Sequence, residues 1–199
     1  MAFTFFFRDK HTLELLTKKM QPKVDGYRKI KVWDAGCAMG PEPYTFGIIM
    51  ADILGHDKYK KALIHATDID ESSHFGETVT NGIYPYSDLS RMPENVLEKY
   101  FNPIGDKKYK IIDLIKNSVS FTRHDLLTLK PIDDRFNAIL CKNVLLHFQP
   151  QQRIDVIKMF HRVLVPGGLF ATEQTQQMPK ECDGLFKKIT TDANIYEKI

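Results

Sequence analysis

Several features that mark particular protein classes are scarce in this sequence. Only three of its 199 residues are cysteines, Cys37, Cys141 and Cys182, an odd number at wide spacing. They do not form a disulfide framework or a C-x-x-C metal pair, so no metal site is expected. No run approaches the roughly 20 apolar residues of a membrane-spanning helix, and residues 1–8 lack the order of a secretory signal. We therefore expect a cytoplasmic protein without membrane insertion.

Excess charge of one sign is also scarce. The 28 Lys and Arg residues nearly balance the 25 Asp and Glu residues, which leaves a formal net charge of +3. This excess can suit an acidic protein partner, but it is too small and too evenly spread to indicate nucleic acid binding. The remaining composition, 43% hydrophobic and 27% charged, is typical of a globular domain that buries a core. We expect one domain over residues 1–199.

Apolar residues alternate between short continuous runs and helical spacing. The helical spacing covers residues 43–54 and 151–164. Five short runs predict strands, at residues 30–33, 63–67, 118–122, 136–141 and 169–172. Strands alternating with helices predict an α/β fold, a doubly wound and mostly parallel sheet with helices on both faces.

Two segments do not fit this alternation. Residues 84–117 are rich in Tyr, Pro, Asp and Lys and predict a small inserted subdomain, a helix followed by a hairpin that turns at Gly105–Asp106. The Phe-rich segment 3–7 is too apolar for a free tail. We expect it to pack against the core or against something outside these residues.

The first predicted strand ends in a glycine-containing turn, Asp34 to Gly40, with the pattern D-x-G-x-x-x-G. Glycine lets the backbone turn sharply and approach a ligand closely, although a tight connection alone also explains it. The turn lacks the G-x-G-x-x-G spacing of dinucleotide enzymes, and Pro41 and Pro43 remove two N–H donors at the helix start. This pattern disfavours a phosphate ligand and favours a nucleoside with an uncharged or amino-acid tail.

Polar residues also follow the next three strands, at the edge where open parallel sheets bind ligands. Asp68 or Asp70 can accept hydrogen bonds from both ribose hydroxyls, or can cap a helix. Asp125 can meet an adenine amino group or act only as a turn residue. His147 is either functional or a half-buried structural histidine. Together the four loops predict one nucleoside-shaped cleft.

The most specific strings are A-G-C-A-x-G-x-E-P-Y-T at residues 35–45 and T-D-I-D at residues 67–70. Shorter matches lie at residues 6–9, 82–84, 100–101, 125–127, 141–145 and 166–168. With these motifs the chain resembles the catalytic domain of the CheR family, chemotaxis receptor methyltransferases. The family transfers a methyl group from S-adenosyl-L-methionine (SAM) to glutamate side chains of chemoreceptors. The resemblance implies a Rossmann-like class I methyltransferase fold, SAM as cofactor and S-adenosylhomocysteine as product.

The resemblance also implies roles for single residues. Six are implied to bind the cofactor: Gly36, Ala38, Glu42, Asp68, Asp125 and Asn143. The first three would line its methionine end, Asp68 would hold the ribose, Asp125 would lie near the adenine, and Asn143 would border the cleft.

Arg8 and His147 are the candidate catalytic residues. Arg8 matches a family arginine at the active site, and His147 stands where the family has a tyrosine. The ordinary pKa of a glutamate carboxylate is about 4.3. A glutamate acceptor is therefore ionised at neutral pH and needs no general base. It does need positioning, for which Arg8 is our candidate, with Lys142 assisting. A hydroxyl or amine acceptor would need a base, and His147 can supply one.

Departures from the family pattern concentrate on the acceptor side. Pro41 replaces an acidic residue, Lys142 replaces an arginine, and residues 173–176 read E-Q-T-Q in place of H-S-E-S. The family's N-terminal helical domain is absent from these residues. The expected partner is a chemoreceptor or another protein substrate. The alternatives are a methyltransferase for a small molecule or another protein, and a non-catalytic regulator that binds SAM.

Overall fold

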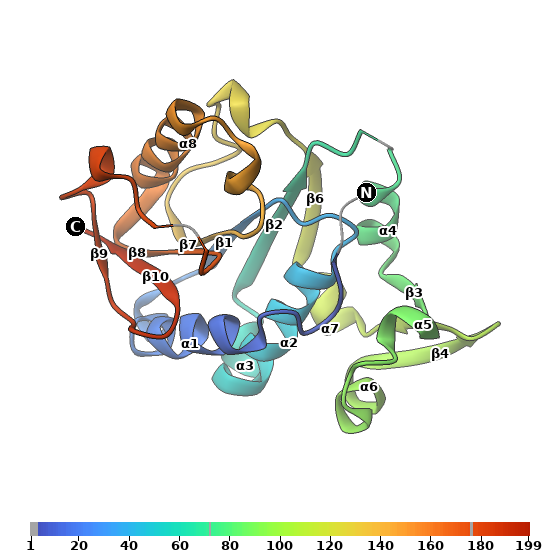
Figure 1. Ribbon diagram of the computed structural model, residues 1–199. Coiled ribbons are helices and arrows are strands. Elements are labelled where there is room, and N and C mark those ends of the chain that lie inside the picture. The colour runs from blue at the N-terminus through green and yellow to red at the C-terminus, as the bar shows by residue number, and fades with distance from the viewer. Residues whose placement is uncertain (1–3, 72, 176) are drawn as a thin grey trace.

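A mixed seven-stranded sheet runs through the computed structural model, which describes residues 4–71, 73–175 and 177–199 (Figure 1). The strand order is β6-β2-β1-β7-β8-β10-β9. Five adjacent strands are parallel: β6 (Val119–Arg123), β2 (Ala62–Asp68), β1 (Ile30–Ala35), β7 (Phe136–Cys141) and β8 (Leu164–Thr172). They correspond to the five predicted strands, so the mostly parallel α/β fold is confirmed. The antiparallel edge formed by β9 (Phe186–Lys188) and β10 (Asn194–Lys198) was not predicted.

Helices cover both faces of the sheet, as its strand pattern requires. Adjacent residues of β1 enter different cores: Val32 packs with α1 (Lys10–Met20) and α2 (Pro41–Leu54), and Trp33 packs with α8 (Pro150–Val163). Figure 1 shows α1 and α2 below the sheet and α8 above it. The predicted helices 43–54 and 151–164 are α2 and α8, whereas α1 was not predicted.

Shorter helical segments connect these elements. They are η1 (Gln21–Gly26), α3 (His56–Tyr59), α4 (Phe75–Asn81), η2 (Leu126–Thr128), η3 (Leu145–His147) and η4 (Lys180–Cys182). In the part of the chain that the structure describes, no helix has the length and apolar character needed to cross a membrane.

The inserted subdomain lies to one side of the main sheet, in green at the lower right of Figure 1. Its elements are β3 (Ile83–Pro85), α5 (Tyr86–Leu89), α6 (Glu94–Tyr100), β4 (Phe101–Gly105), β5 (Lys108–Ile111) and α7 (Asp113–Lys116). The predicted helix and hairpin are α6 and β4–β5, which β3 extends to a three-stranded sheet. The hairpin turns at Asp106 and Lys107, one residue later than predicted, and both have the positive φ of a two-residue turn.

The Phe-rich N-terminal segment packs against this subdomain. Phe6 is 2% exposed, and its ring meets those of Tyr84 and Phe101 edge-on at centroid distances of 4.9 and 5.6 Å. The expectation that the segment packs against the core therefore holds for Phe6, whereas Phe3 lies outside the described residues. The turn that follows Phe6 carries Arg8 to the edge of the sheet.

The strand order reverses between β1 and β7, because the chain moves outward through β2 on one side and β8 on the other. In open parallel sheets, ligands bind at the carboxyl ends of the strands at such a reversal. The loops after β1 and β7 therefore flank the expected binding crevice.

Candidate cofactor and active site

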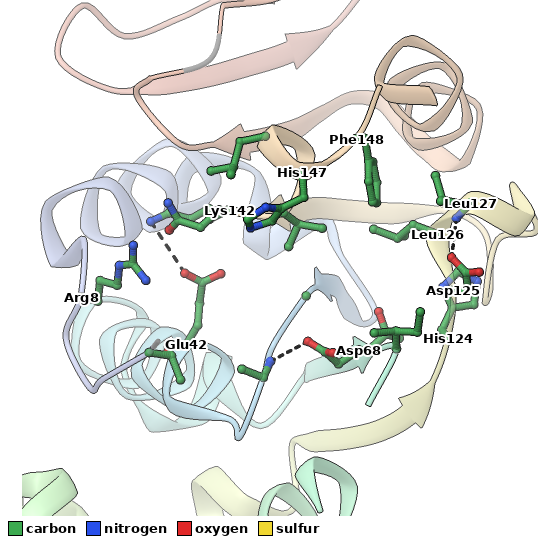
Figure 2. A pocket seen from close by; sticks show the side chains of 18 residues that line it. Arg8, Glu42, Asp68, His124, Asp125, Leu126, Leu127, Lys142, His147 and Phe148 are labelled. Carbon is green, nitrogen blue, oxygen red and sulfur yellow. Dashed lines mark hydrogen bonds and ion pairs between the residues drawn. The ribbon is translucent and has the colours of Figure 1, made fainter. Parts of the chain in front are cut away.

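A cavity of about 640 Å³ opens at this reversal (Figure 2). Its walls are the N-terminal turn, the start of α2 and the loops after β1, β2, β6 and β7. Every residue predicted for the site lines it: Arg8, Gly36, Ala38, Glu42, Asp68, Asp125, Asn143 and His147. Residues more than 130 positions apart in the sequence are thus brought to one cavity.

The turn after β1 needs its first glycine for two reasons. Gly36 has φ 113°, and a Cβ placed on it would lie 2.1 Å from Cγ2 of Val144, in the loop after β7. The N–H groups of Gly36 and Cys37 both donate to the carbonyl oxygen of Thr67, at 2.8 and 3.0 Å. Glycine therefore lets the two loops that flank the cavity approach each other.

Gly36→Ala is expected to lower the thermal midpoint more than Gly55→Ala. Both glycines have positive φ, but a Cβ at Gly55 meets nothing within 4 Å, so that variant has only backbone strain, about 1–3 kcal/mol. At Gly36 the Cβ also displaces Val144. Thermal unfolding should show Gly36→Ala at least about 4 °C below Gly55→Ala, and Val144→Ala should recover part of the loss. Equal midpoints for the two glycine variants would contradict the close approach.

Asp68 and Asp70 have different roles in the loop after β2. Asp70 is 4% exposed, and its carboxylate accepts N–H groups at the start of α4: those of His74, Phe75 and Gly76. The helix-capping alternative therefore describes Asp70. Asp68 is half-buried at the cavity wall, where it accepts the Ala38 N–H at 2.9 Å and the Asp70 N–H at 3.2 Å.

Asp125 is a turn residue that also lines the cavity. Its Oδ1 accepts the N–H of Leu127 at 2.8 Å, which starts η2. Leu126, Leu127 and Phe148 surround the same end of the cavity (Figure 2). This end therefore combines apolar walls with one carboxylate, an environment that suits a flat heteroaromatic ring with an amino group.

At the opposite end, charged residues meet around Lys142. The Lys142 side chain is 1% exposed, hydrogen-bonds to Asp9, and lies 3.7 Å from Oε2 of Glu42. Burial raises the pKa of Glu42, and Lys142 opposes that shift. Arg8, half-buried, extends toward this group from the N-terminal turn (Figure 2). Lys142 is thus enclosed by carboxylates at the cavity wall, whereas His147 is exposed at the mouth.

Asp34 is an acidic residue beside the cavity that begins the D-x-G-x-x-x-G pattern but received no role from the sequence. It lies at the end of β1, two residues before Gly36, and is fully buried. Within the described residues, neither of its carboxylate oxygens has a hydrogen-bond partner. Burial raises its pKa well above the usual range, the nearby charges of Glu42 and Asp68 raise it further, and Lys142 opposes the shift. The sequence did contain one indication of this burial, an acidic residue directly after an apolar strand.

Glu173 was noted only as a departure from the family pattern, and the structure gives it a role. It is 5% exposed after β8, and its Oε2 accepts the N–H of Asn143 and the hydroxyl of Thr172, both at 2.9 Å. Asn143 has φ 59°, which few non-glycine residues adopt. Glu173 therefore supports the loop after β7 in the conformation that lines the cavity.

Residues 2–195 match the family model described as CheR methyltransferase, SAM binding domain. The chain belongs to the CheR methyltransferase family. The predicted resemblance, the class I methyltransferase fold and SAM as cofactor are therefore confirmed.

Two curated relatives of the chain are named chemotaxis protein methyltransferase. The protein of Borreliella burgdorferi is 30% identical over 169 residues, which cover 81% of this chain and 59% of the relative. That of Vibrio parahaemolyticus is 31% identical over 171 residues, which cover 83% and 61%. The chain thus spans about three fifths of the length of these relatives.

A solved structure of another protein shares the fold of this chain. PKMT2 from Rickettsia typhi, in complex with AdoHcy, matches with a TM-score of 0.51 and 16% identity over 86% of this chain and 26% of that one. At this identity the similarity concerns the fold alone.

Proposed function

We propose that this chain is the catalytic domain of a SAM-dependent protein-glutamate O-methyltransferase of chemotaxis type. The observation that carries the proposal is the convergence of all eight predicted site residues on one cavity in a CheR-family domain. The curated relatives named as chemotaxis methyltransferases support it. A chemoreceptor or another cytoplasmic protein would be the methyl acceptor.

The cofactor would be held along the whole cavity. Asp68 would accept the ribose hydroxyls, and Asp125 with its apolar neighbours would take the adenine. The methionine end would lie near Glu42 and Asp34, because an ammonium group supplies the hydrogen-bond donors that the Asp34 carboxylate lacks. Gly36 and Ala38 form the turn on which the methionine portion would rest.

Asp34→Asn is expected to strengthen the fold and weaken cofactor binding. The pKa of Asp34 is raised in the folded state. In the unfolded chain the same group has a pKa of about 3.9, so above that pH the folded protein keeps a proton that the unfolded chain has lost. The unfolding free energy of the wild type therefore falls as pH rises from that value to the raised pKa. Asparagine removes this loss, so at neutral pH the variant should have the higher thermal midpoint.

The same variant loses a charged partner for the ammonium group. Because hydrogen bonds to charged groups contribute about 1.5–3 kcal/mol, calorimetry should show SAM affinity reduced by at least about tenfold. The stability difference should disappear in a pH series that goes below about 3.9. If the variant bound SAM with wild-type affinity and had an unchanged thermal midpoint, Asp34 would not contact the methionine end of the cofactor.

In this proposal the protein acts by positioning. SAM supplies an activated methyl group, and the transfer requires the acceptor oxygen in line at about 3–3.5 Å. A glutamate acceptor is already ionised at neutral pH, so no side chain has to remove a proton. Arg8 would hold the acceptor carboxylate by charge-assisted hydrogen bonds, and His147 at the mouth would orient it.

A labelled-methyl assay tests the proposed function. The chain is incubated with methyl-labelled SAM and a chemoreceptor fragment that contains methylatable glutamates, and label released by base as methanol is counted. A fragment with those glutamates changed to alanine is the matched control. We expect base-labile label on the first fragment only. Base-stable label, or SAM binding in calorimetry without any transfer, would contradict the proposal.

A further inference from the structure

The turn that carries Arg8 is connected to the far side of the cavity by an ion pair whose lysine is buried and whose carboxylate, on Asp9, is 43% exposed. Asp9 is the residue before α1, and its carboxylate bonds to the ammonium of Lys142, which follows β7. The two residues are 133 positions apart. The N-terminal turn is thus joined to the loop that bears Asn143 and His147.

The backbone of this turn needs such support. Phe7 and Asp9, on either side of Arg8, have φ of 61° and 54°, a conformation that aspartate tolerates but that is uncommon for a bulky residue such as phenylalanine. Two contacts fix the start of the turn: Phe6 is buried against the inserted subdomain, and the Phe7 N–H donates to Oγ1 of Thr45 at 3.0 Å. On the far side of Arg8, the ion pair of Asp9 holds the turn against the cavity.

Lys142 also depends on Asp9, because its ammonium group is buried. A lysine ammonium whose side chain is 1% exposed must be paired, because an isolated buried charge is strongly unfavourable. Glu42 lies at 3.7 Å, beyond hydrogen-bond distance, whereas Asp9 is in direct contact. Together Asp9, Glu42, Lys142 and Arg8 form a group of two negative and two positive charges.

We propose that Asp9 is a positioning residue: through Lys142 it fixes the turn in the conformation that directs Arg8 to the methyl-acceptor side of the cavity. This inference rests on the proposed function, because it assigns Arg8 an acceptor. Without the ion pair, the Asp9 carboxylate no longer joins the turn to the loop after β7, and the position of Arg8 at the cavity is less restricted. The cofactor subsites at Asp68 and Asp125 lie on other loops and are not affected.

Asp9→Asn tests the proposal, with Glu14→Gln as the matched control. Glu14 pairs with Lys10 at 3.5 Å on the surface of the same helix, so its variant removes a carboxylate without touching the cavity. We expect Asp9→Asn to lower kcat/KM for the acceptor fragment about tenfold or more and to change SAM affinity by less than about threefold. Glu14→Gln should match the wild type in both. Asp9→Glu should restore part of the activity.

A double-mutant cycle separates positioning from a general structural effect. If Asp9 acts through Arg8, adding Asp9→Asn to Arg8→Ala should cause almost no further loss, because the positioned group is already gone. The proposal would be overturned if the double variant lost kcat/KM by the product of the two single losses. It would also be overturned if both Asp9→Asn and a second variant, Asp9→Ser, had the wild-type kcat/KM.

An NMR measurement keeps this inference independent of the proposed function. The side-chain Nε–H signal of Arg8 should show a reduced order parameter in Asp9→Asn and an unchanged one in Glu14→Gln. This readout needs no turnover. If wild-type protein transfers no methyl group but Arg8 still loses order in Asp9→Asn, the proposed function fails while the attachment of the turn stands. An Arg8 signal that is equally ordered in both variants overturns the positioning role.

A change in the pH dependence of binding is a further readout. Asp9 is among the groups that raise the pKa of Glu42, while Lys142 and Arg8 lower it. Removing the Asp9 charge should therefore lower the pKa of Glu42, so any acid-side loss of SAM affinity caused by Glu42 protonation should move to lower pH. A general loosening of the fold would not produce this shift in that direction. An unchanged profile would contradict the charge group described above.

Discussion

Asp68→Asn is expected to weaken SAM binding by about 30- to 100-fold, because two charge-assisted hydrogen bonds to the ribose would be replaced by weaker ones. Asparagine can still accept the N–H of Ala38 through its one carbonyl oxygen, but its NH2 group then faces the N–H of Asp70, so that one backbone hydrogen bond is lost. The thermal midpoint of the free protein should therefore fall only modestly, by about 2–4 °C for a loss of about 1 kcal/mol. Calorimetric titration with SAM, beside thermal unfolding without it, separates the two quantities.

Asp70→Asn is the matched control, since it makes the same chemical change two residues away. The Asp70 carboxylate accepts three N–H groups at the start of α4, so its loss should lower stability by about 1–2 kcal/mol, a midpoint shift of about 2–8 °C. SAM affinity should stay within about threefold of the wild type. If Asp70→Asn abolished binding while Asp68→Asn preserved it, the two roles would be exchanged.

The pair also shows where sequence reasoning stops. T-D-I-D follows a clear apolar strand, so both aspartates are expected at the binding edge of the sheet, but either can cap a helix. The choice depends on α4, a seven-residue helix whose sequence carries no strong periodic signal. Only the structure, in which the Asp70 carboxylate turns to α4, assigns the capping role.

Elements with strong local patterns were predictable, and elements fixed by distant contacts were not. The strand β7 is buried along its whole length, so its apolar run was a direct signal. The strands β10 and β9 are short and partly exposed, and they extend the predicted sheet antiparallel, with β9 at the edge. Their place depends on the hydrogen bonds of β10 to β8 and of β9 to β10, which no local pattern encodes.

The same distinction applies within the site. Gly36, Asp68 and Asp125 follow the ends of predicted strands, and that position indicated the cavity. Arg8 and Glu42 lie on other elements, and only the family resemblance singled them out.

The burial of Asp34, the support of Asn143 by Glu173 and the pairing of Lys142 with Asp9 are contacts between residues far apart or facing inward. A charged side chain in a sequence gives no indication that it is enclosed, so these contacts required the fold.

Arg8→Ala is expected to reduce kcat/KM for the acceptor by about 100- to 10,000-fold, the largest effect that we predict on turnover. The estimate follows from two charge-assisted hydrogen bonds to the acceptor carboxylate, about 1.5–3 kcal/mol each, both lost together. SAM affinity should change by less than about fivefold, because the adenine and ribose subsites lie on other loops. Steady-state methyl transfer to the receptor fragment, with calorimetry of SAM, measures the two effects.

Arg8→Lys distinguishes the guanidinium from its charge. Lysine keeps the positive charge but cannot form the two parallel hydrogen bonds with which arginine holds a carboxylate. A turnover midway between wild type and Arg8→Ala would assign part of the effect to charge and part to the planar geometry. If Arg8→Ala instead turned over at the wild-type rate, Arg8 would have no acceptor to hold, and the positive charge for the acceptor would have to come from another residue of the cavity. Lys142 would then be the first to test, although in the folded state Asp9 and Glu42 enclose its ammonium.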